Sequence, residues 1–303
     1  TVRLEAKEDS RIMGLLTLTE VRHPIFGNYL TTAPFASYGG FVYETEHVRD
    51  TLLEATNDLR HSLGVDYIIV RFDRGDEPPP VGWEQHPVYA TYLVNLEAGK
   101  EALMTGFSSN HRNHIRKSQR KGFRIRFGHL ELLDDAYEGL ARSMHELGSP
   151  YHRKNYLYAM AKSLKDTLEF AVVYDSSGEL VGSGVFIKHG QLVTNLHANI
   201  LRKYRPDYAG EYFYWSAIEH YLRVGMKTFD LGRSLIKSGN ENFKMKWKPR
   251  VQLLSYWYAL SPGVSLPDLN QKNPKFRLAI KIWQRLPRPV VRILGSSLIR
   301  GLA

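Results

Sequence analysis

The stretch AGEYFYWSAIEHYLRVGMKTFDL, residues 209–231, indicates which fold the chain adopts. Its first part carries apolar residues at nearly helical spacing: Phe213, Ala217, Ile218 and Leu222. Gly225 then provides a turn into the apolar run 228–231, so the stretch predicts a helix followed directly by a buried strand. A β-rich run that opens with a glycine, GQLVTN at 190–195, comes before it.

The same order of segments occurs earlier in the chain. GNYLTT at 27–32 resembles GQLVTN, and residues 46–70 again combine a helical apolar pattern, a turn glycine (Gly64) and a strand. The matched residues that follow are Trp83 with Trp247, Tyr92 with Tyr256, Leu96 with Leu260 and Gly99 with Gly263. Because the offset stays between 161 and 164 residues throughout, we infer an internal duplication.

Each copy is predicted to contain a hairpin, a strand, a helix, a strand and a final strand. Helices are also expected at 132–147 and 152–165, and a hairpin at 170–174 and 181–188. We therefore expect an α/β protein of the layered α+β kind, with two domains in tandem, each a mixed central sheet flanked by helices. The expected boundaries are 1–105, 106–263 and a tail at 264–303. Since the first copy lacks the segment that precedes the hairpin of the second, we expect that an N-terminal piece has been lost.

Composition narrows the class of protein. The 303 residues are 43% hydrophobic, which is enough for two cores, and the absence of cysteine excludes disulfides, thiolate metal sites and a cysteine nucleophile. No apolar run reaches the length of a membrane span, and the charged start is not a signal peptide, so we expect a cytoplasmic protein, with the inner face of the membrane as an alternative. The net charge of +10 is concentrated in residues 102–130 and after Asp268, two segments without acidic residues. This pattern favours local surfaces that face anions.

The segment FDLGRSLIKSGNENFKMKWKPR, 229–250, contains the candidate catalytic residue. If it is extended, Lys244, Lys246 and Lys248 share one face while Phe243 and Trp247 share the other with Met245. A lysine at the end of a central strand is suited to stabilising negative charge that develops in a reaction, so we predict this role for Lys244. The alternative is a solvated edge strand protected by lysines.

Two further residues of this segment are candidates. Arg233 follows Gly232 at the end of the predicted strand, where a guanidinium suits bidentate binding of phosphate or carboxylate, although a structural salt bridge is equally consistent. Asp230 is either a general base or, as we slightly prefer, a buried partner of Arg233.

Three motifs together resemble one family. RNHIRKSQRKG (112–122), FDLGRS (229–234) and NENFKMKWKP (240–249) are similar to the FemAB-like family of tandem GNAT-like acyl-CoA N-acyltransferase domains, and most similar to its exosortase/PEP-CTERM-associated subgroup. The resemblance implies transfer of an aminoacyl or acyl group to an amine on a cell-envelope or exopolysaccharide precursor, with the acceptor linked to a lipid or nucleotide. The donor would be aminoacyl-tRNA or acyl-CoA, with no tightly bound cofactor. No long charged coiled-coil arm is inserted in the second half, unlike in members that use tRNA.

The resemblance also suggests where the donor binds. In a GNAT-like fold the donor pyrophosphate meets the start of the helix at 209, so Gly210 would approach it and Arg202, Lys203 and Arg205 would add positive charge. The basic helix with Arg112 and Arg116 on one face is expected to contact nucleotide phosphates or tRNA, or else to be a solvated surface. His111 and His114 have no nearby carboxylate or cysteine, so we predict no metal site.

The residue pattern of the tail predicts a basic amphipathic helix that begins at Pro274 and is broken at Pro287 and Pro289. Its apolar stripe contains Phe276, Ala279, Ile280, Trp283 and Leu286, with Arg277, Lys281 and Arg285 on another stripe. The stripe either packs on the protein, as we expect, or lies on an anionic membrane.

The sequence leaves two classes of function. Without a cysteine or a serine in a nucleophile elbow, an N-acyltransferase would act by direct transfer in a ternary complex. The alternative is a non-catalytic module that binds an anionic glycan or nucleotide-sugar in a cleft between the domains.

Overall fold

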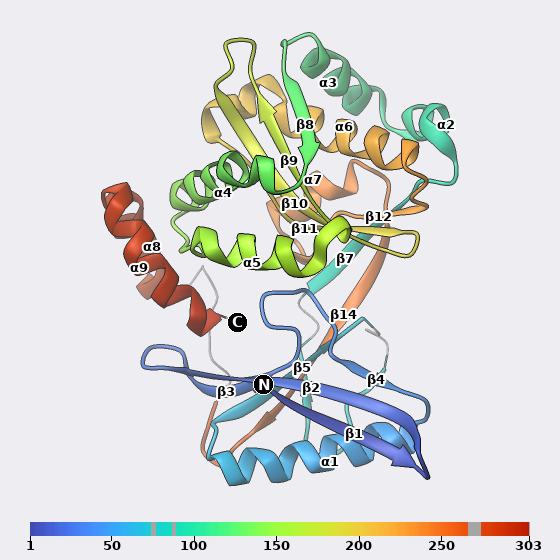
Figure 1. Cartoon of the computed structure of the whole chain (residues 1–303), viewed down its shortest axis with the longest axis vertical. Coiled ribbons are helices and arrows are strands. Elements are labelled where there is room, and N and C mark those ends of the chain that lie inside the picture. Colours follow the sequence, from blue (N-terminus) through green and yellow to red (C-terminus); the bar gives the residue numbers. More distant parts are fainter. Residues whose placement is uncertain (74–76, 87–88, 266–273, 303) are drawn as a thin grey trace.

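The computed structural model describes residues 1–73, 77–86, 89–265 and 274–302, with the side chains of 274–277 and 302 outside the description. The molecule has two halves, and two long strands run between them (Figure 1). It is a mixed α/β structure in which helices cover a central sheet, as the sequence predicts.

The first half is built around one helix and five strands. Their bounds are β1 (Val2–Glu8), β2 (Arg11–His23), β3 (Gly27–Thr31), β4 (Phe41–Tyr43), α1 (Glu46–Leu63) and β5 (Tyr67–Phe72). The short β6 (Glu84–Gln85) and the strand β7 (Tyr89–Asn95) follow. Thr45 caps the start of α1. Gly64 ends the helix, as the sequence pattern predicts, in the left-handed conformation with φ of 60°.

The second half contains more helices. Its elements before the duplicated region are α2 (Gly99–Gly106), α3 (Ser109–Gln119), β8 (Arg124–Gly128), α4 (Leu133–Leu147) and α5 (Lys154–Leu164). The remainder consists of β9 (Leu168–Tyr174), β10 (Leu180–His189), β11 (Leu192–Ile200), α6 (Ala209–Arg223), β12 (Thr228–Asp230), β13 (Ser234–Leu235), α7 (Gly239–Met245) and β14 (Arg250–Leu260). The predicted helices at 132–147 and 152–165 and the predicted hairpin correspond to α4, α5, β9 and β10.

The sheet topology confirms the tandem fold. In the described residues the strands form one sheet in the order β1-β2-β3-β5-β14-β7-β12-β11-β10-β9-β8. In each copy the strand before the helix pairs in parallel with the strand after it: β3 with β5, and β11 with β12. The final strands are exchanged, because β7 pairs with β12 and β14 pairs with β5. Each copy therefore completes the sheet of the other, while the boundaries at 105 and 263 stay predictions for the sequence units.

Helix burial follows the duplicated pattern. In α1, Leu52 and Leu53 are buried against Ile68 and Val70 of the first sheet, and in α6, Phe213 and Ile218 belong to the core of the second. Removing such side chains from water contributes about 1.5–3 kcal/mol each. These two cores fix the positions of the strand ends where the candidate site lies.

The tail packs on the protein, as we expected. It forms α8 (Pro274–Arg285) and α9 (Arg288–Leu298), beside α4 of the second half (Figure 1). Trp283 is buried and its carbonyl lies 3.0 Å from Nε2 of His145, while Nε of Arg153 donates to Oγ of Ser296 over 2.8 Å. The predicted residues Phe276 and Arg277 lie outside the described side chains. No helix in the described part of the chain is long and apolar enough to cross a membrane.

Candidate functional site

The candidate site is the place where two neighbouring strands separate. β11 and β12 pair only from Leu192–Thr194 to Thr228–Asp230, and beyond this ladder they diverge. A cavity of about 300 Å³ lies in the opening. Its walls are residues 195–199 of β11, the corner 231–234 after β12, Tyr214 of α6, part of α7 and residues 35–37 of the first half.

The corner after β12 requires a glycine. Gly232 has φ of 78°, and a Cβ at this position would lie 2.7 Å from the carbonyl oxygen of Asn195. Asp230 holds the corner from inside, since its carboxylate accepts from the backbone N–H of Gly232 over 2.8 Å and from the hydroxyl of Thr91. Burial raises the pKa of Asp230. Its fully buried side chain does not line the cavity.

The structure corrects the expected conformation around Lys244. Residues 243–248 are not an extended run with a lysine face, because 239–245 form the helix α7. Ser238 caps this helix by accepting from the backbone N–H of Glu241 over 3.2 Å. Residues 238–241, SGNE, therefore form the Ser-x-x-Glu pattern that is typical of a helix start. The prediction of an extended run did not take this pattern into account. As a result Lys244 is buried, while Lys246 and Lys248 are exposed.

Lys244 lies under the corner and reaches the cavity. Its Nζ donates to the carbonyl oxygens of Gly232, at 2.6 Å, and Arg233, at 2.8 Å, and lies 5.3 Å from the ring centre of Tyr92. Burial lowers the pKa of Lys244 to about 7, an effect that Asp230 opposes and Arg233 reinforces. A cavity lined by an amine that is half protonated near neutral pH is suited to proton transfer and to stabilising negative charge.

Arg233 faces the cavity between aromatic rings. Its guanidinium carbon lies 5.0 Å from the ring centre of Tyr89 and 5.9 Å from that of Tyr256, and it donates to the hydroxyl of Tyr256. The expected ion pair with Asp230 is therefore not formed. Although protein surrounds Arg233, its side chain is open to solvent through the cavity. Stacking holds the guanidinium in place and leaves its other N–H groups for an anionic ligand.

Three further polar residues line the cavity and were not anticipated. Nε2 of His197, Oδ1 of Asn195 and Oγ of Ser234 are buried and have no hydrogen-bond partner among the residues that the structure describes. Burial, aided by the charge of Arg233, lowers the pKa of His197 to about 4, so its ring is neutral near pH 7. Buried polar groups are normally satisfied, so these atoms are suited to a polar ligand. The sequence signal is the alternation of Asn195, His197 and Asn199 along one strand.

Of the two aromatic residues predicted to bind a ligand, one lines the cavity and the other lies away from it. Phe243 lines the cavity and packs near Gly210, whereas Trp247 is buried 4.5 Å from the ring of His111, measured between ring centres. Both of these aromatic residues support α7, but only Phe243 could contact a ligand in the cavity.

The basic residues before α6 lie outside the cavity. Nζ of Lys203 pairs with Glu179 at 2.6 Å, and the backbone N–H of Arg202 donates to Glu146. Arg202, Lys203 and Arg205 are all exposed and none lines the cavity. A role in donor binding stays a prediction for these three residues.

The basic helix α3 also lies apart from the cavity. Arg112 donates to the backbone carbonyls of Thr105 and Phe107, so it joins α3 to the end of α2, while Arg116 is exposed. His114 stacks on Tyr208, with 4.2 Å between ring centres. The predicted phosphate contacts of Arg112 and Arg116 stay predictions.

The equivalent opening in the first half is closed. The backbone N–H of Thr32 donates to the carbonyl of Ile69 over 3.0 Å, and that of Gly39 to the carbonyl of Arg71 over 3.1 Å. These bonds join the segment after β3 to the edge of β5, where β11 and β12 separate in the second half. Pro80 also stands at the position that matches Lys244 in the duplication. Within its described residues, the first half therefore has neither the opening nor an amine at the position that matches Lys244.

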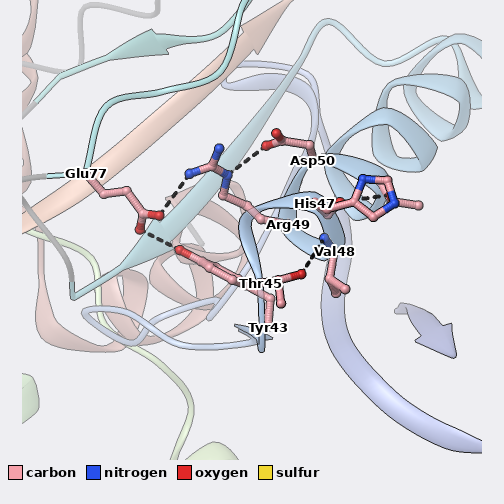
Figure 2. Close-up of polar contacts among 8 residues, drawn as sticks. Tyr43, Thr45, His47, Val48, Arg49, Asp50 and Glu77 are labelled. Carbon is pink, nitrogen blue, oxygen red and sulfur yellow. Dashed lines mark hydrogen bonds and ion pairs between the residues drawn. The ribbon is translucent and has the colours of Figure 1, made fainter. Parts of the chain in front are cut away.

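A carboxylate of the chain itself lies over the start of α1. Glu77 accepts from the guanidinium of Arg49, at 2.9 Å, and from the hydroxyl of Tyr43 (Figure 2). Arg49 also pairs with Asp50 at 2.7 Å. α1 corresponds to α6 in the duplication, so the equivalent helices begin beside different side chains in the two copies.

Fold and site together place the protein among the tandem GNAT-type folds, with an open strand junction in the second copy only. Residues 108–245 match the family model described as "Acetyltransferase (GNAT) domain". The matched region includes the strand junction and α7, and it supports N-acyl transfer as the general chemistry. A search of the curated proteins found no match to this sequence.

Solved structures share the fold at low sequence identity. The chain is similar to FemX, with a TM-score of 0.65 and 11% identity over 86% of this chain and 88% of that one. It is similar to L-PGS from Bacillus licheniformis, with a TM-score of 0.57 and 14% identity over 90% and 87% of the two chains. It is also similar to a tandem GNAT protein from the clavulanic acid biosynthesis pathway, with a TM-score of 0.57 and 10% identity over 87% of this chain and 83% of that one. The fold is therefore that of tandem GNAT proteins, whereas the exosortase-associated subgroup stays a prediction.

Proposed function

We propose that the protein is an N-acyltransferase that moves an acyl or aminoacyl group to an amine on a cell-envelope or exopolysaccharide precursor. The observation that carries this proposal is the position of Lys244, a buried amine with a pKa of about 7 on the wall of a cavity between separated strands. Lowered pKa values of groups that line a cavity are common at functional sites, which supports a catalytic role for this amine.

The chemistry follows from the residues that surround the amine. The acceptor nitrogen forms a bond to the donor carbonyl carbon, and the carbonyl oxygen becomes an oxyanion in the tetrahedral intermediate. The ammonium of Lys244 donates a hydrogen bond to this oxyanion while the carbonyls of Gly232 and Arg233 hold its other two protons. The bond to the donor sulfur or oxygen then breaks, and the proton lost by the acceptor nitrogen neutralises the leaving group.

Asp230 supports this arrangement from outside the cavity. Its negative charge raises the pKa of Lys244 against the effect of burial, and its hydrogen bond fixes Gly232. We assign it a positioning role in place of the base role considered from sequence, because the carboxylate is enclosed.

The acceptor is proposed to carry an anionic group near its amine. Arg233 presents N–H groups to the cavity, and Asn195, His197 and Ser234 offer further polar atoms. A sugar or peptide precursor with a carboxylate or phosphate would match this lining. The donor is an acyl-CoA or an aminoacyl-tRNA, whose phosphates would meet the basic residues before α6 and on α3.

The test has two parts. Mass spectrometry of ligands that co-purify with the full chain should identify a CoA species, a tRNA or a linked sugar. With the donor known, Lys244→Met should abolish most turnover while the dissociation constant for the donor changes little. If turnover persists and only affinity changes, the protein is a binding module for an anionic glycan or nucleotide-sugar and the transferase proposal is wrong.

A further inference from the structure

The helices α8 and α9 are apolar on two sides. Their inner side is anchored on the protein, where Trp283 and Val291 are buried and Gly295 lies so close to Tyr151 that a Cβ would be 3.2 Å from its carbonyl oxygen. Of the apolar stripe expected from sequence, Trp283 is buried on this inner side and Ile280 lies against Gly148, whereas Ala279 is exposed. The outer side carries a second set of large apolar residues that the sequence pattern did not separate from the first.

These outer residues are strongly exposed. Leu278 is 62% exposed, Ile282 53% and Ile293 66%, and Val290 and Leu294 are exposed beside them. Positions 278 and 282 are four apart, and 290, 293 and 294 are three and four apart, so each helix presents its set on one face. A single exposed leucine needs no explanation, whereas such a set on two consecutive helices indicates a surface that is covered in function.

The charges on the same face are all positive. Lys281 and Arg285 are four residues apart and share the face of Leu278 and Ile282 on α8, and both are exposed. No acidic residue follows Asp268 in the sequence. Two other arginines of the tail, Arg288 and Arg292, are turned to Glu138 of α4. We define the tail face by its members: Leu278, Lys281, Ile282, Arg285, Val290, Ile293 and Leu294.

We propose that the tail face binds the surface of an anionic lipid bilayer. The apolar side chains would enter the boundary between headgroups and acyl chains, and Lys281 and Arg285 would meet the phosphates. The inner side is already anchored, so the helices need not leave the protein to bind. The sequence left two roles for the tail, packing on the protein and contact with a membrane. In this proposal the inner side of the helices has the first role and the outer side has the second.

The charge pattern favours lipid over a second copy of the chain. A symmetric dimer through the tail face would bring the cations of both copies together without a described acidic residue on that face to compensate them. An anionic membrane removes this repulsion and buries the apolar residues at the same time. The combination of large apolar residues with cations is the pattern of helices that lie in a membrane interface.

The inner side of α9, opposite the tail face, lies close to the wall of the cavity. Gly295 of α9 packs on Tyr151, and the ring of Tyr151 lies 5.9 Å from the ring of His197, measured between their centres. His197 is part of the cavity wall. One layer of side chains therefore separates the inner side of α9 from the candidate site.

The experiment is co-sedimentation of the full chain with vesicles of phosphatidylcholine alone and of phosphatidylcholine mixed with phosphatidylglycerol. We expect binding only to the mixed vesicles, and weaker binding at high salt because the Debye length falls from about 10 Å at 0.1 M to about 3 Å at 1 M. Lys281→Gln with Arg285→Gln should lower the partition coefficient about thirtyfold, at about 1 kcal/mol for each cation. Ile282→Asn with Ile293→Asn should lower it on the order of tenfold or more.

The matched control is Ile25→Asn with Val42→Asn, which replaces exposed apolar residues of the first half, 66% and 62% exposed. This variant should bind as the unchanged chain does. Equal loss in the control, or absence of binding to the mixed vesicles, overturns the proposal, as does a dimer in solution that the Ile282 and Ile293 variant dissociates. The measurement needs no acyl donor, so its failure leaves the transferase proposal untouched.

Discussion

The side chain of Lys244 donates to the carbonyl oxygen of Gly232 over 2.6 Å, which ties the amine of α7 to the corner that ends β12. The corner is itself held by Asp230, through the backbone N–H of Gly232. The position of the amine and the separation of the two strands are thus set by one small network. Changes to each of its members should have different and measurable effects.

Replacing the amine tests its chemical role. Lys244→Met keeps most of the side-chain volume and removes the hydrogen-bond donor, so kcat should fall on the order of a hundredfold or more, as for the loss of one oxyanion donor. The carbonyls of Gly232 and Arg233 lose a partner, at a cost of about 1–3 kcal/mol in the free energy of unfolding. The variant also no longer desolvates an ammonium, which lowers the cost, but it leaves the buried Asp230 without its cation, which raises it. Steady-state kinetics and denaturant unfolding measure the two effects separately, and unchanged kcat would exclude a catalytic role.

The free energy of unfolding should depend on pH through Lys244. Its pKa is about 7 in the folded protein, against 10.5 as the ordinary value, so between these pH values the unfolded chain binds more protons. Stability should therefore rise as pH increases from about 7 to about 10.5, by on the order of 5 kcal/mol from this group. Below pH 7 the group is protonated in both states and contributes no slope.

Lys244→Met is the matched comparison for this pH dependence. The difference in unfolding free energy between the two proteins, measured by denaturant titration at several pH values, isolates the contribution of the amine. A difference that is flat between pH 7 and 10.5 would show that the lysine is not desolvated.

Neutralising Asp230 should shift the titration of the lysine. The carboxylate raises the pKa of Lys244, so Asp230→Asn should lower that pKa below its present value of about 7. The amide oxygen can still accept from the backbone of Gly232, which should preserve the corner. We expect the pH-dependent rise in stability to begin at lower pH, and kcat at neutral pH to decrease because less ammonium is present. An unshifted onset would show that the two groups are not electrostatically coupled.

The general fold was accessible from sequence because it depends on patterns that repeat. The signals are local: the helical spacing of Phe213 and Ile218 and the turn at Gly225. The same pattern occurs a second time around Gly64, which makes the prediction stronger. The exchange of β7 and β14 was not accessible, since pairing between copies depends on long-range contacts that leave the alternation within each strand unchanged.

The site was predicted only in part, for equally physical reasons. Lys244 and Arg233 were placed at the end of the second-copy strand, and the structure brings both to one cavity. The alternation of lysines with aromatic residues at 243–248 suggested a strand. The structure instead has a helix at 239–245, which Ser238 caps, with Lys244 and Trp247 buried. The expected ion pair between Asp230 and Arg233 is not formed. The guanidinium of Arg233 instead packs on Tyr89 and Tyr256, which belong to the exchanged strands.

The corner itself gives the most direct test of the local structure. Gly232→Ala places a methyl group 2.7 Å from the carbonyl oxygen of Asn195 at a φ of 78°, so strain and a steric clash act together. Gly225→Ala is the matched control, because φ there is 80° but nothing lies within 4 Å of the added carbon. The control should lose about 1 kcal/mol in unfolding free energy and Gly232→Ala about 2–4 kcal/mol. Only Gly232→Ala should also move Lys244 and reduce turnover, and equal losses in both variants would show that the close approach to Asn195 does not constrain the corner.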